Sequence, residues 1–216
     1  MNAIRGPGPP AAPPHHANHG FPMQPTNYDI DEVLVTPRRL EQRVHELAAE
    51  MAAGCKSDNL VLIGVLRGSF IFIADMVRWF YMNDLHPRID FMIMESYSGT
   101  TSRGEPTVSR DFTIDIKGAD VVLVDDILDT GRTLTKATAH VWSKGPATVR
   151  TCVLLDKPDR RIVPAEADYK GFVIPDLFVV GYGLDYDGRH RELPHIAHVR
   201  FHDAPAAEAA PTTAEA

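Results

Sequence analysis

Residues 121–133, with the sequence VVLVDDILDTGRT, constrain the fold of this chain more than any other segment. The run of four apolar residues, mostly β-branched, is typical of a parallel-sheet strand that is buried on both faces. Asp125 and Asp126 follow at its carboxyl end, the edge at which open α/β sheets bind ligands. Asp129 then begins a Thr-Gly-Arg-Thr turn into a helix expected to run to about Ser143. The segment therefore predicts carboxylates beside the free amides of a helix N-terminus.

Strand and helix patterns alternate along the chain, which indicates an α/β fold with a mostly parallel sheet flanked by helices. Two further helices are predicted, over residues 36–54 and 68–80. Strands are predicted over residues 59–66, 88–97, 111–116, 119–126, 148–157 and 177–184. Between them, the polar residues 98–110 are rich in Gly, Ser and Thr, and we expect a long mobile loop that closes over a site.

Composition divides the chain into one domain and two tails. Residues 1–27 contain seven prolines and three histidines but few aliphatic residues, which predicts a disordered leader. We expect the domain over residues 28–203 and a second disordered tail over 204–216. His15, His16 and His19 have no acidic or cysteine neighbours, so a solvated segment is favoured over a metal site.

Charge and hydropathy exclude several classes of protein. The net charge of −7 and the scattered basic residues argue against a general nucleic-acid binder. No segment has the 18 or so apolar residues of a membrane span, and the N-terminus lacks a secretion signal, so we expect a cytoplasmic protein without a membrane partner. Two cysteines cannot build a disulfide framework, and Cys152 is interpreted as a core residue.

A phosphate-binding turn beside paired carboxylates suits a sugar phosphate, because the turn can bind the phosphate while the acids bind hydroxyl groups or a hydrated Mg²⁺. Two other nucleotide sites are disfavoured. No Gly-x-x-x-x-Gly-Lys-Ser/Thr loop accompanies the paired acids, and no Gly-x-Gly-x-x-Gly follows the first strand.

Residues 121–133 resemble the phosphoribosyl-pyrophosphate (PRPP) loop of the type I phosphoribosyltransferases. Four further segments, in the expected order, are similar to the hypoxanthine-guanine branch: Leu66-Arg67-Gly68-Ser69, Glu95-Ser96-Tyr97, Lys157 and residues 178–193, FVVGYGLDYDGRHREL. The resemblance covers about residues 28–201. It implies the type I phosphoribosyltransferase fold with a small hood region, and transfer of phosphoribosyl from PRPP to a 6-oxopurine, which forms IMP or GMP and pyrophosphate in purine salvage. Mg²⁺ as cofactor and a homodimer or homotetramer are also implied.

The resemblance assigns the PRPP half of the site. Asp125 and Asp126 would bind the ribose 2- and 3-hydroxyls and help to hold metal. The 5-phosphate would lie on the turn formed by Asp129, Thr130, Gly131, Arg132 and Thr133. The pyrophosphate would be bound by Leu66, Arg67, Gly68 and Arg191, with a non-proline cis peptide at Leu66-Arg67. Two positions depart from human-type sequences, which have Lys where this chain has Arg132 and Gly-Gly where it has Gly68-Ser69.

The purine half follows from the same resemblance. Lys157 would donate to the purine O6, Phe178 would stack on the ring, and the Val179 backbone would contact the exocyclic edge. Asp129 would take the N7 proton as catalytic base, and Asp185 would help to hold a second magnesium ion. Ser96 and Tyr97 would begin the closing loop.

Alternatives remain open from sequence. Asp129 could only cap a helix, Lys157 could end a strand at the surface, and Phe178 could belong to the core. A xanthine-preferring enzyme is the nearest functional rival, and uracil or orotate are other possible bases. A non-catalytic nucleotide-sensing regulator is a rival from another class. The aromatic residues Trp79, Phe80 and Tyr81 could form an oligomer interface or complete the core.

Overall fold

The computed structural model of the protein describes residues 27–54, 57–99 and 102–202. A six-stranded sheet with the order β4-β3-β2-β5-β6-β7 forms its centre. Neighbouring strands are parallel except at the β3–β4 edge, which is antiparallel. The strand bounds are β2 (Leu60–Leu66), β3 (Arg88–Gly99), β4 (Ser102–Arg110), β5 (Asp120–Leu128), β6 (Thr148–Asp156) and β7 (Tyr169–Val173).

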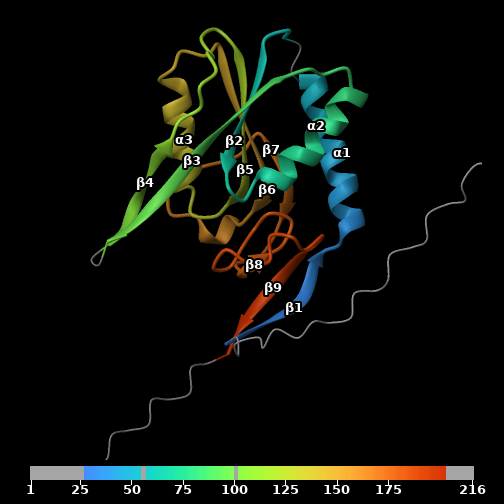
Figure 1. The fold of residues 1–216 in the computed structure, drawn as a ribbon, viewed down its shortest axis with the longest axis vertical. Coiled ribbons are helices and arrows are strands. Elements are labelled where there is room, and N and C mark those ends of the chain that lie inside the picture. The colour runs from blue at the N-terminus through green and yellow to red at the C-terminus, as the bar shows by residue number, and fades with distance from the viewer. Residues whose placement is uncertain (1–26, 55–56, 100–101, 203–216) are drawn as a thin grey trace, which may run out of the picture.

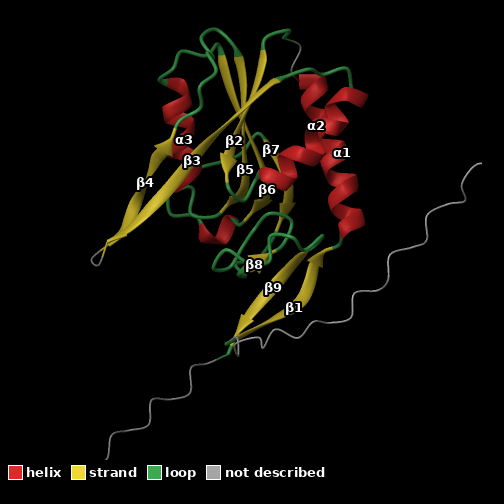
Figure 2. Cartoon of the chain, in the orientation of Figure 1, coloured by secondary structure: helices red, strands yellow, loops and turns green. Residues whose placement is uncertain are grey.

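Helices cover both faces of this sheet, as Figures 1 and 2 show. Helices α1 (Pro37–Gly54) and α2 (Phe70–Met82) lie against one face, and α3 (Arg132–Trp142) lies against the other. The apolar run of β5 divides between the two layers. Val122 and Val124 pack in the cluster with α1 and α2, whereas Val121 and Leu123 pack in the cluster with α3. The predicted strand buried on both faces is confirmed.

A small antiparallel sheet lies below the main one in Figure 1 and joins distant parts of the sequence. Its order is β1-β9-β8, with β1 (Tyr28–Val35), β8 (Val179–Val180) and β9 (Ile196–Phe201). Tyr28, Val180 and Val199 form its buried cluster. This sheet and the loop over residues 181–193 form the hood region that the family resemblance implies, and the fold class is confirmed.

The segment 98–110 was wrongly predicted to be a loop. Residues 102–110 form β4, which pairs with β3 from Ile93↔Arg110 to Gly99↔Ser102. In Figure 1 the two strands extend away from the main body as a ribbon. The sequence does not reveal this strand, because Val108 is its one aliphatic residue that packs on the core, and backbone pairing to β3 provides the remaining contacts without an apolar pattern.

The predicted strand over residues 111–116 is also wrong. Phe112 and Ile116 are buried, but they pack from an irregular segment. The Asp90 carboxylate accepts the backbone N–H groups of Thr113 and Ile114, at 2.7 and 3.1 Å, where a neighbouring strand would otherwise be needed.

The last long strand, predicted over residues 177–184, is reduced to Val179–Val180. Gly181, Tyr182 and Gly183 all have positive φ angles, of 98°, 51° and 103°, so the extended conformation ends there. Strands β1, β7 and β9 were not predicted. Helix α2 begins at Phe70, two residues later than expected.

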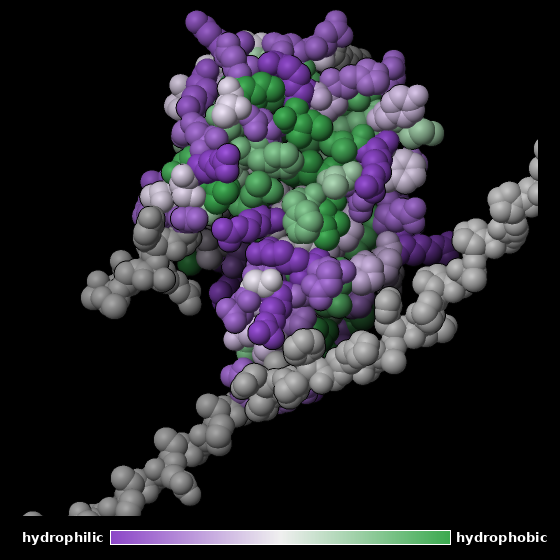
Figure 3. All heavy atoms as spheres, in the orientation of Figure 1, coloured by the Kyte–Doolittle hydropathy of each residue, from purple (hydrophilic) through white to green (hydrophobic). Residues whose placement is uncertain are grey.

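The aromatic residues at the end of α2 have separate fates. Phe80 is in the core and Trp79 packs partly against it, whereas Tyr81 is 76% exposed. Figure 3 shows hydrophobic residues gathered over α2 and β3 on this face.

Cys152 is fully buried in the core, as predicted. The proposed leader, apart from Asn27, and the proposed tail lie outside the described residues. Within the part described, no helix is long and apolar enough to cross a membrane.

Candidate functional site

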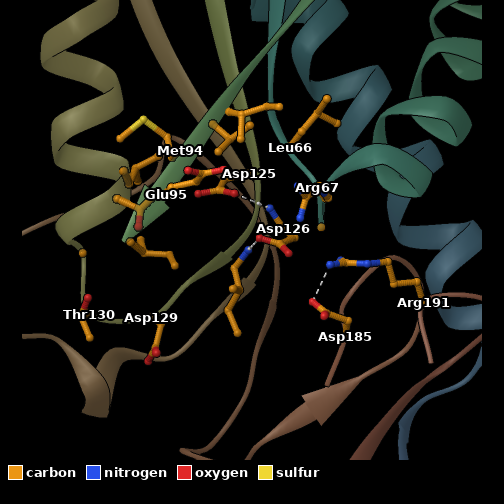
Figure 4. Close-up of a pocket in the computed structure, with 18 residues that line it drawn as sticks. Leu66, Arg67, Met94, Glu95, Asp125, Asp126, Asp129, Thr130, Asp185 and Arg191 are labelled. Atoms are coloured by element: carbon orange, nitrogen blue, oxygen red, sulfur yellow. Dashed lines mark hydrogen bonds and ion pairs between the residues drawn. The ribbon is translucent and has the colours of Figure 1, made fainter. Parts of the chain in front are cut away.

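The site lies where the strand order reverses. The chain passes from β2 outward to β3 and then returns to place β5 on the other side of β2, so β2 and β5 flank a topological switch point. Ligands of open α/β sheets bind at the carboxyl ends of strands there. A cavity of about 440 Å³ occupies this position. Figure 4 shows Asp125 and Asp126 in its middle, with Arg67 and Arg191 on one side and Asp129 and Thr130 on the other.

The loop after β2 forms one wall of this cavity. Its Leu66–Arg67 peptide bond is cis, as the resemblance implies. Gly68 follows against the end of β5, where a Cβ atom would lie only 1.4 Å from Asp126 Oδ2. Only glycine lets this backbone approach the carboxylate so closely. The loop and the paired acids are therefore fitted to each other.

The paired acids at the end of β5 are largely removed from water. Asp125 is 4% exposed, and its Oδ1 accepts the N–H of Asp126 at 3.0 Å. Burial, together with the neighbouring Asp126 carboxylate, raises the pKa of Asp125 well above its usual range. Burial also raises the pKa of Asp126, while Arg191 acts in the opposite direction. Two poorly hydrated carboxylates at a cavity are suited to accept hydrogen bonds from ligand hydroxyls.

The turn from β5 into α3 forms the opposite wall. Gly131 has φ of 86°, and a Cβ atom there would lie 2.6 Å from the Val163 carbonyl oxygen. The Thr130 carbonyl accepts the N–H groups of Ile162 and Val163, at 3.0 and 3.1 Å, so the segment after β6 fixes the turn from outside. The turn therefore places the N-terminus of α3, with Thr130, Gly131 and Thr133, at the cavity, as expected for a phosphate site. Arg132 begins α3 but does not line the cavity.

The hood contributes one acidic and one basic side chain, those of Asp185 and Arg191, to the same cavity. Asp185 and Arg191 form an ion pair with Oδ1 and Nη2 at 2.7 Å, drawn as a dashed line in Figure 4. The backbone N–H of Gly188 donates to Asp185 Oδ2 at 2.7 Å, and Arg191 donates to the Gly183 carbonyl at 2.6 Å. Both side chains are thus held in place by the loop that carries them.

A second cavity of about 460 Å³ adjoins the first and shares Asp126, Ile127, Asp129 and Asp185 with it. Lys157, Phe178 and Val179 line it, as predicted for a purine pocket. Lys157 is 7% exposed, and its burial lowers the pKa of the ammonium group although Asp129 and Asp176 act to raise it. A buried cation of this kind favours a ligand that offers an acceptor.

Phe178 is not a core residue, because it is 42% exposed in this cavity. Its ring contacts Tyr186 and Phe201 edge to face, with centroids 5.5 Å away in both pairs. Neighbouring rings from the hood loop and from β9 therefore support it. The ring therefore lines the cavity with much of its surface exposed.

Sequence reasoning missed several residues of the two cavities. Met94 from β3 lines the first, and Arg160 and Asp176 line the second; Glu95, which the resemblance included without a role, also lines the first. Arg160 and Arg161 directly follow the Lys157 segment, in the run DKPDRR, which is the one signal that could have identified them. Arg161 donates to the carbonyls of Leu128 and Asp129 and pairs with the buried Asp156.

Two predicted residues stay untested at the level of side chains. Ser96 and Tyr97 lie in β3, but their side chains are outside the described part of the structure. Every other predicted site residue except Arg132 lines one of the two cavities. Within residues 27–54, 57–99 and 102–202, no three His, Cys, Asp or Glu side chains cluster closely enough to form a metal site by themselves.

Comparison with known proteins agrees with this geometry. A family model described as "Phosphoribosyl transferase domain" matches residues 31–187. The chain is 42% identical over 169 residues to the hypoxanthine-guanine phosphoribosyltransferase of Streptococcus pneumoniae, a match that covers 78% of this chain and 92% of that protein. It is 43% identical over 172 residues to the hypoxanthine phosphoribosyltransferase of Haemophilus influenzae, with 78% and 94% covered.

Solved structures give the same result. The hypoxanthine phosphoribosyltransferase of Staphylococcus aureus superimposes with a TM-score of 0.74 at 39% identity, over 80% of this chain and 92% of that one. The Trypanosoma cruzi enzyme superimposes with a TM-score of 0.75 at 37% identity, over 79% and 92%. The chain therefore belongs to the phosphoribosyltransferase family, among its hypoxanthine and hypoxanthine-guanine members.

Proposed function

We propose that this protein transfers the phosphoribosyl group of PRPP to N9 of hypoxanthine or guanine, which forms IMP or GMP and releases pyrophosphate in purine salvage. One observation carries the proposal: the polar cavity at the end of β5 and the cavity with Lys157 and Phe178 share Asp126, Asp129 and Asp185. A sugar phosphate in the first cavity and a base in the second would meet along these shared carboxylates.

The PRPP half is assigned from the chemistry of each wall. The amides of residues 129–133 would bind the 5-phosphate, and the Asp125 and Asp126 carboxylates would accept the ribose hydroxyls. Arg67 and Arg191 would add fixed positive charge at the pyrophosphate. Because the ribose ring becomes cationic as the C1–O bond breaks, carboxylates beneath it also stabilise the transition state.

Asp129 would act as the general base. N9 forms a bond to C1 while pyrophosphate leaves with the electrons of the C1–O bond, and the proton on N7 passes to the Asp129 carboxylate. Asp129 lines both cavities, which supports this assignment. A base positioned in this way contributes about 10²- to 10⁴-fold to the rate.

Purine selection would depend on Lys157. Its ammonium can donate to a 6-oxo group, whereas a 6-amino group would present another donor and leave the buried charge without an acceptor. Adenine should therefore be a poor substrate. Phe178 would stack on the ring, and the Val179 backbone would contact the 2-position.

Mg²⁺ is the cofactor that the donor set suits. Asp185, with Asp125 and Asp126, offers only carboxylate oxygens, and no closed protein cage exists among the described residues. Mg²⁺ commonly binds through one or two carboxylates together with substrate phosphates. Bound at the pyrophosphate, the ion supplies charge neutralisation of the leaving group.

A homodimer or homotetramer is proposed from the exposed apolar surface over α2 and β3. Phe70, Met82, Ile89 and Phe91 are 44%, 69%, 40% and 36% exposed. Such a patch is typical of a protein interface. The T. cruzi structure comes from work on how the C-terminal region affects oligomeric state and activity of that enzyme. Light scattering of the wild type and of Phe91→Glu would test this; a wild-type monomer would contradict it.

The catalytic proposal is tested with a panel of bases. Hypoxanthine, guanine, xanthine, adenine, uracil and orotate are each offered with PRPP and Mg²⁺, and pyrophosphate release is measured. We expect turnover of hypoxanthine or guanine, loss of activity with EDTA and recovery with added Mg²⁺. Preference for xanthine would revise the base, activity on pyrimidines alone would refute the purine assignment, and no turnover of any base would refute the enzyme. A cytoplasmic location stays a prediction.

A further inference from the structure

Arg160 joins two carboxylates in the purine pocket. It lies at the end of the short 3-10 turn Pro158–Arg160, directly after Lys157. Its Nε atom is 3.3 Å from Asp129 Oδ1, and its Nη1 donates to Asp176 Oδ2 at 3.3 Å. The three side chains are 42%, 36% and 44% exposed. Ion pairs this exposed add little to stability, so stability alone does not account for the arrangement.

The two oxygens of Asp129 differ in their surroundings. Oδ1 is buried and accepts no hydrogen bond, although Arg160 Nε is near, whereas the side chain as a whole is 36% exposed. The exposed surface of the carboxylate therefore lies on the Oδ2 side. A buried carboxylate oxygen without a hydrogen bond is unfavourable, and the adjacent guanidinium charge offsets that cost. Without the charge, Asp129 would be free to rotate its carboxylate toward water.

The main chain of Asp129 is fixed separately. Arg161, which directly follows Arg160 in the sequence, donates a hydrogen bond to the backbone carbonyl of Asp129. Two neighbouring arginines thus contact Asp129: Arg161 contacts its backbone carbonyl, and Arg160 contacts its carboxylate. Asp176, on the segment between β7 and β8, anchors the Arg160 guanidinium from its other end.

We propose that Arg160 is a positioning residue that turns Asp129 Oδ2 toward the bound purine. The inference rests on the proposed function, because it assumes that Asp129 accepts the N7 proton. In this role Arg160 acts through Asp129 and need not touch the purine. Its removal should lower the rate of the chemical step and leave PRPP binding unchanged.

The test is a double-mutant cycle on the full chain, with PRPP, Mg²⁺ and hypoxanthine. The variants are Arg160→Gln, Arg160→Lys, Asp129→Asn and the Arg160→Gln/Asp129→Asn double variant, with the exposed Arg38→Gln of α1 as matched control. We expect Arg160→Gln to lower kcat on the order of 10- to 100-fold, since a small misplacement of a reacting group has effects of this size. KM for PRPP should not change, Arg160→Lys should restore part of kcat, and Arg38→Gln should match the wild type.

The decisive comparison is between the effect of Arg160→Gln on kcat in the wild type and its effect in the Asp129→Asn variant. In Asp129→Asn, the change Arg160→Gln should lower kcat less than about 2-fold, because residues that act as a unit are not additive. An equal loss in both backgrounds would overturn the proposal, as would a raised KM with unchanged kcat. If Arg160→Gln does not fold, Asp176→Asn replaces it, and wild-type kcat there would count against the idea. An inactive wild type would instead refute the proposed function itself.

Discussion

Gly68→Ala tests whether the loop after β2 and the acids after β5 position each other. An added Cβ would lie 1.4 Å from Asp126 Oδ2, against about 3.5 Å for ordinary contact, so about 2 Å of movement is required. If the Asp126 carboxylate rotates, it loses the hydrogen bond that its Oδ1 accepts from Ile127 N–H at 2.8 Å. If the loop moves instead, Arg67 leaves its place at the cavity.

The free energies can be compared. The lost hydrogen bond costs about 1 kcal/mol, and an off-rotamer side chain costs about 1 kcal/mol. The lower entropy of the unfolded alanine chain offsets about 0.5–1 kcal/mol, which leaves a net loss of about 1 kcal/mol of unfolding free energy. Activity should fall far more, because misplacing a binding group by 1 Å or more reduces kcat/KM by about 10²-fold.

Thermal unfolding and pyrophosphate release measured on the same preparations separate these effects. Gly118→Ala is the matched control, because Gly118 has φ of 68°, nothing lies within 4 Å of its added Cβ, and it precedes β5 at the opposite edge of the sheet. That variant should lose about 1 kcal/mol and keep full activity. If Gly68→Ala keeps kcat/KM within about 2-fold, the close approach does not position the site and the reasoning fails.

Three further predictions concern the purine pocket and the core. Lys157→Gln should lower kcat/KM for hypoxanthine by about 10- to 150-fold, the loss of one charged hydrogen bond, and reduce discrimination against adenine; equal losses for both bases would contradict this. Phe201→Ala removes an edge-to-face partner of Phe178 and should raise KM for the purine about 3- to 10-fold, while Phe201→Leu has a smaller effect and KM for PRPP stays constant. Burial raises the pKa of the Cys152 thiol, so iodoacetamide at about pH 8.5 should label it only after urea unfolding, as mass spectrometry of its peptide would reveal.

The sequence was most informative where burial and chemistry coincide. The apolar run before Asp125 predicted a central strand. The Asp, Gly and Thr residues that follow it predicted a ligand site at the carboxyl end of that strand. The resemblance to the phosphoribosyltransferases, through the segments around Lys157 and Asp185, then indicated the remaining walls of the two cavities. These parts of the site required no knowledge of distant contacts.

The remaining features depend on contacts that no local pattern contains. Strands β1 and β9 pair across most of the chain, from Tyr28↔Phe201 to Val35↔Ile196, so neither is evident by itself. The ribbon of β3 and β4 is joined by backbone pairing, and the residues of it that pack on the core, such as Met94 and Val108, are too few to form a clear strand pattern. Arg160 and Asp176 are separated by 16 positions in the sequence. Only the fold brings Arg160 into contact with both Asp176 and Asp129, so their relation to the site is not evident from the sequence.

In the proposed binding mode, the two sheets would support the purine independently. Lys157 follows β6 of the main sheet, whereas Val179 begins β8 of the small sheet, which β1 and β9 complete, and Phe178 directly precedes that strand. The 6-position of a base would then be recognised by one structural unit and its ring face and 2-position by another. Substitutions in the small sheet would then change the preference among hypoxanthine, guanine and xanthine without changing the binding of the sugar phosphate. In this binding mode, base preference would therefore depend on the small sheet separately from the catalytic centre.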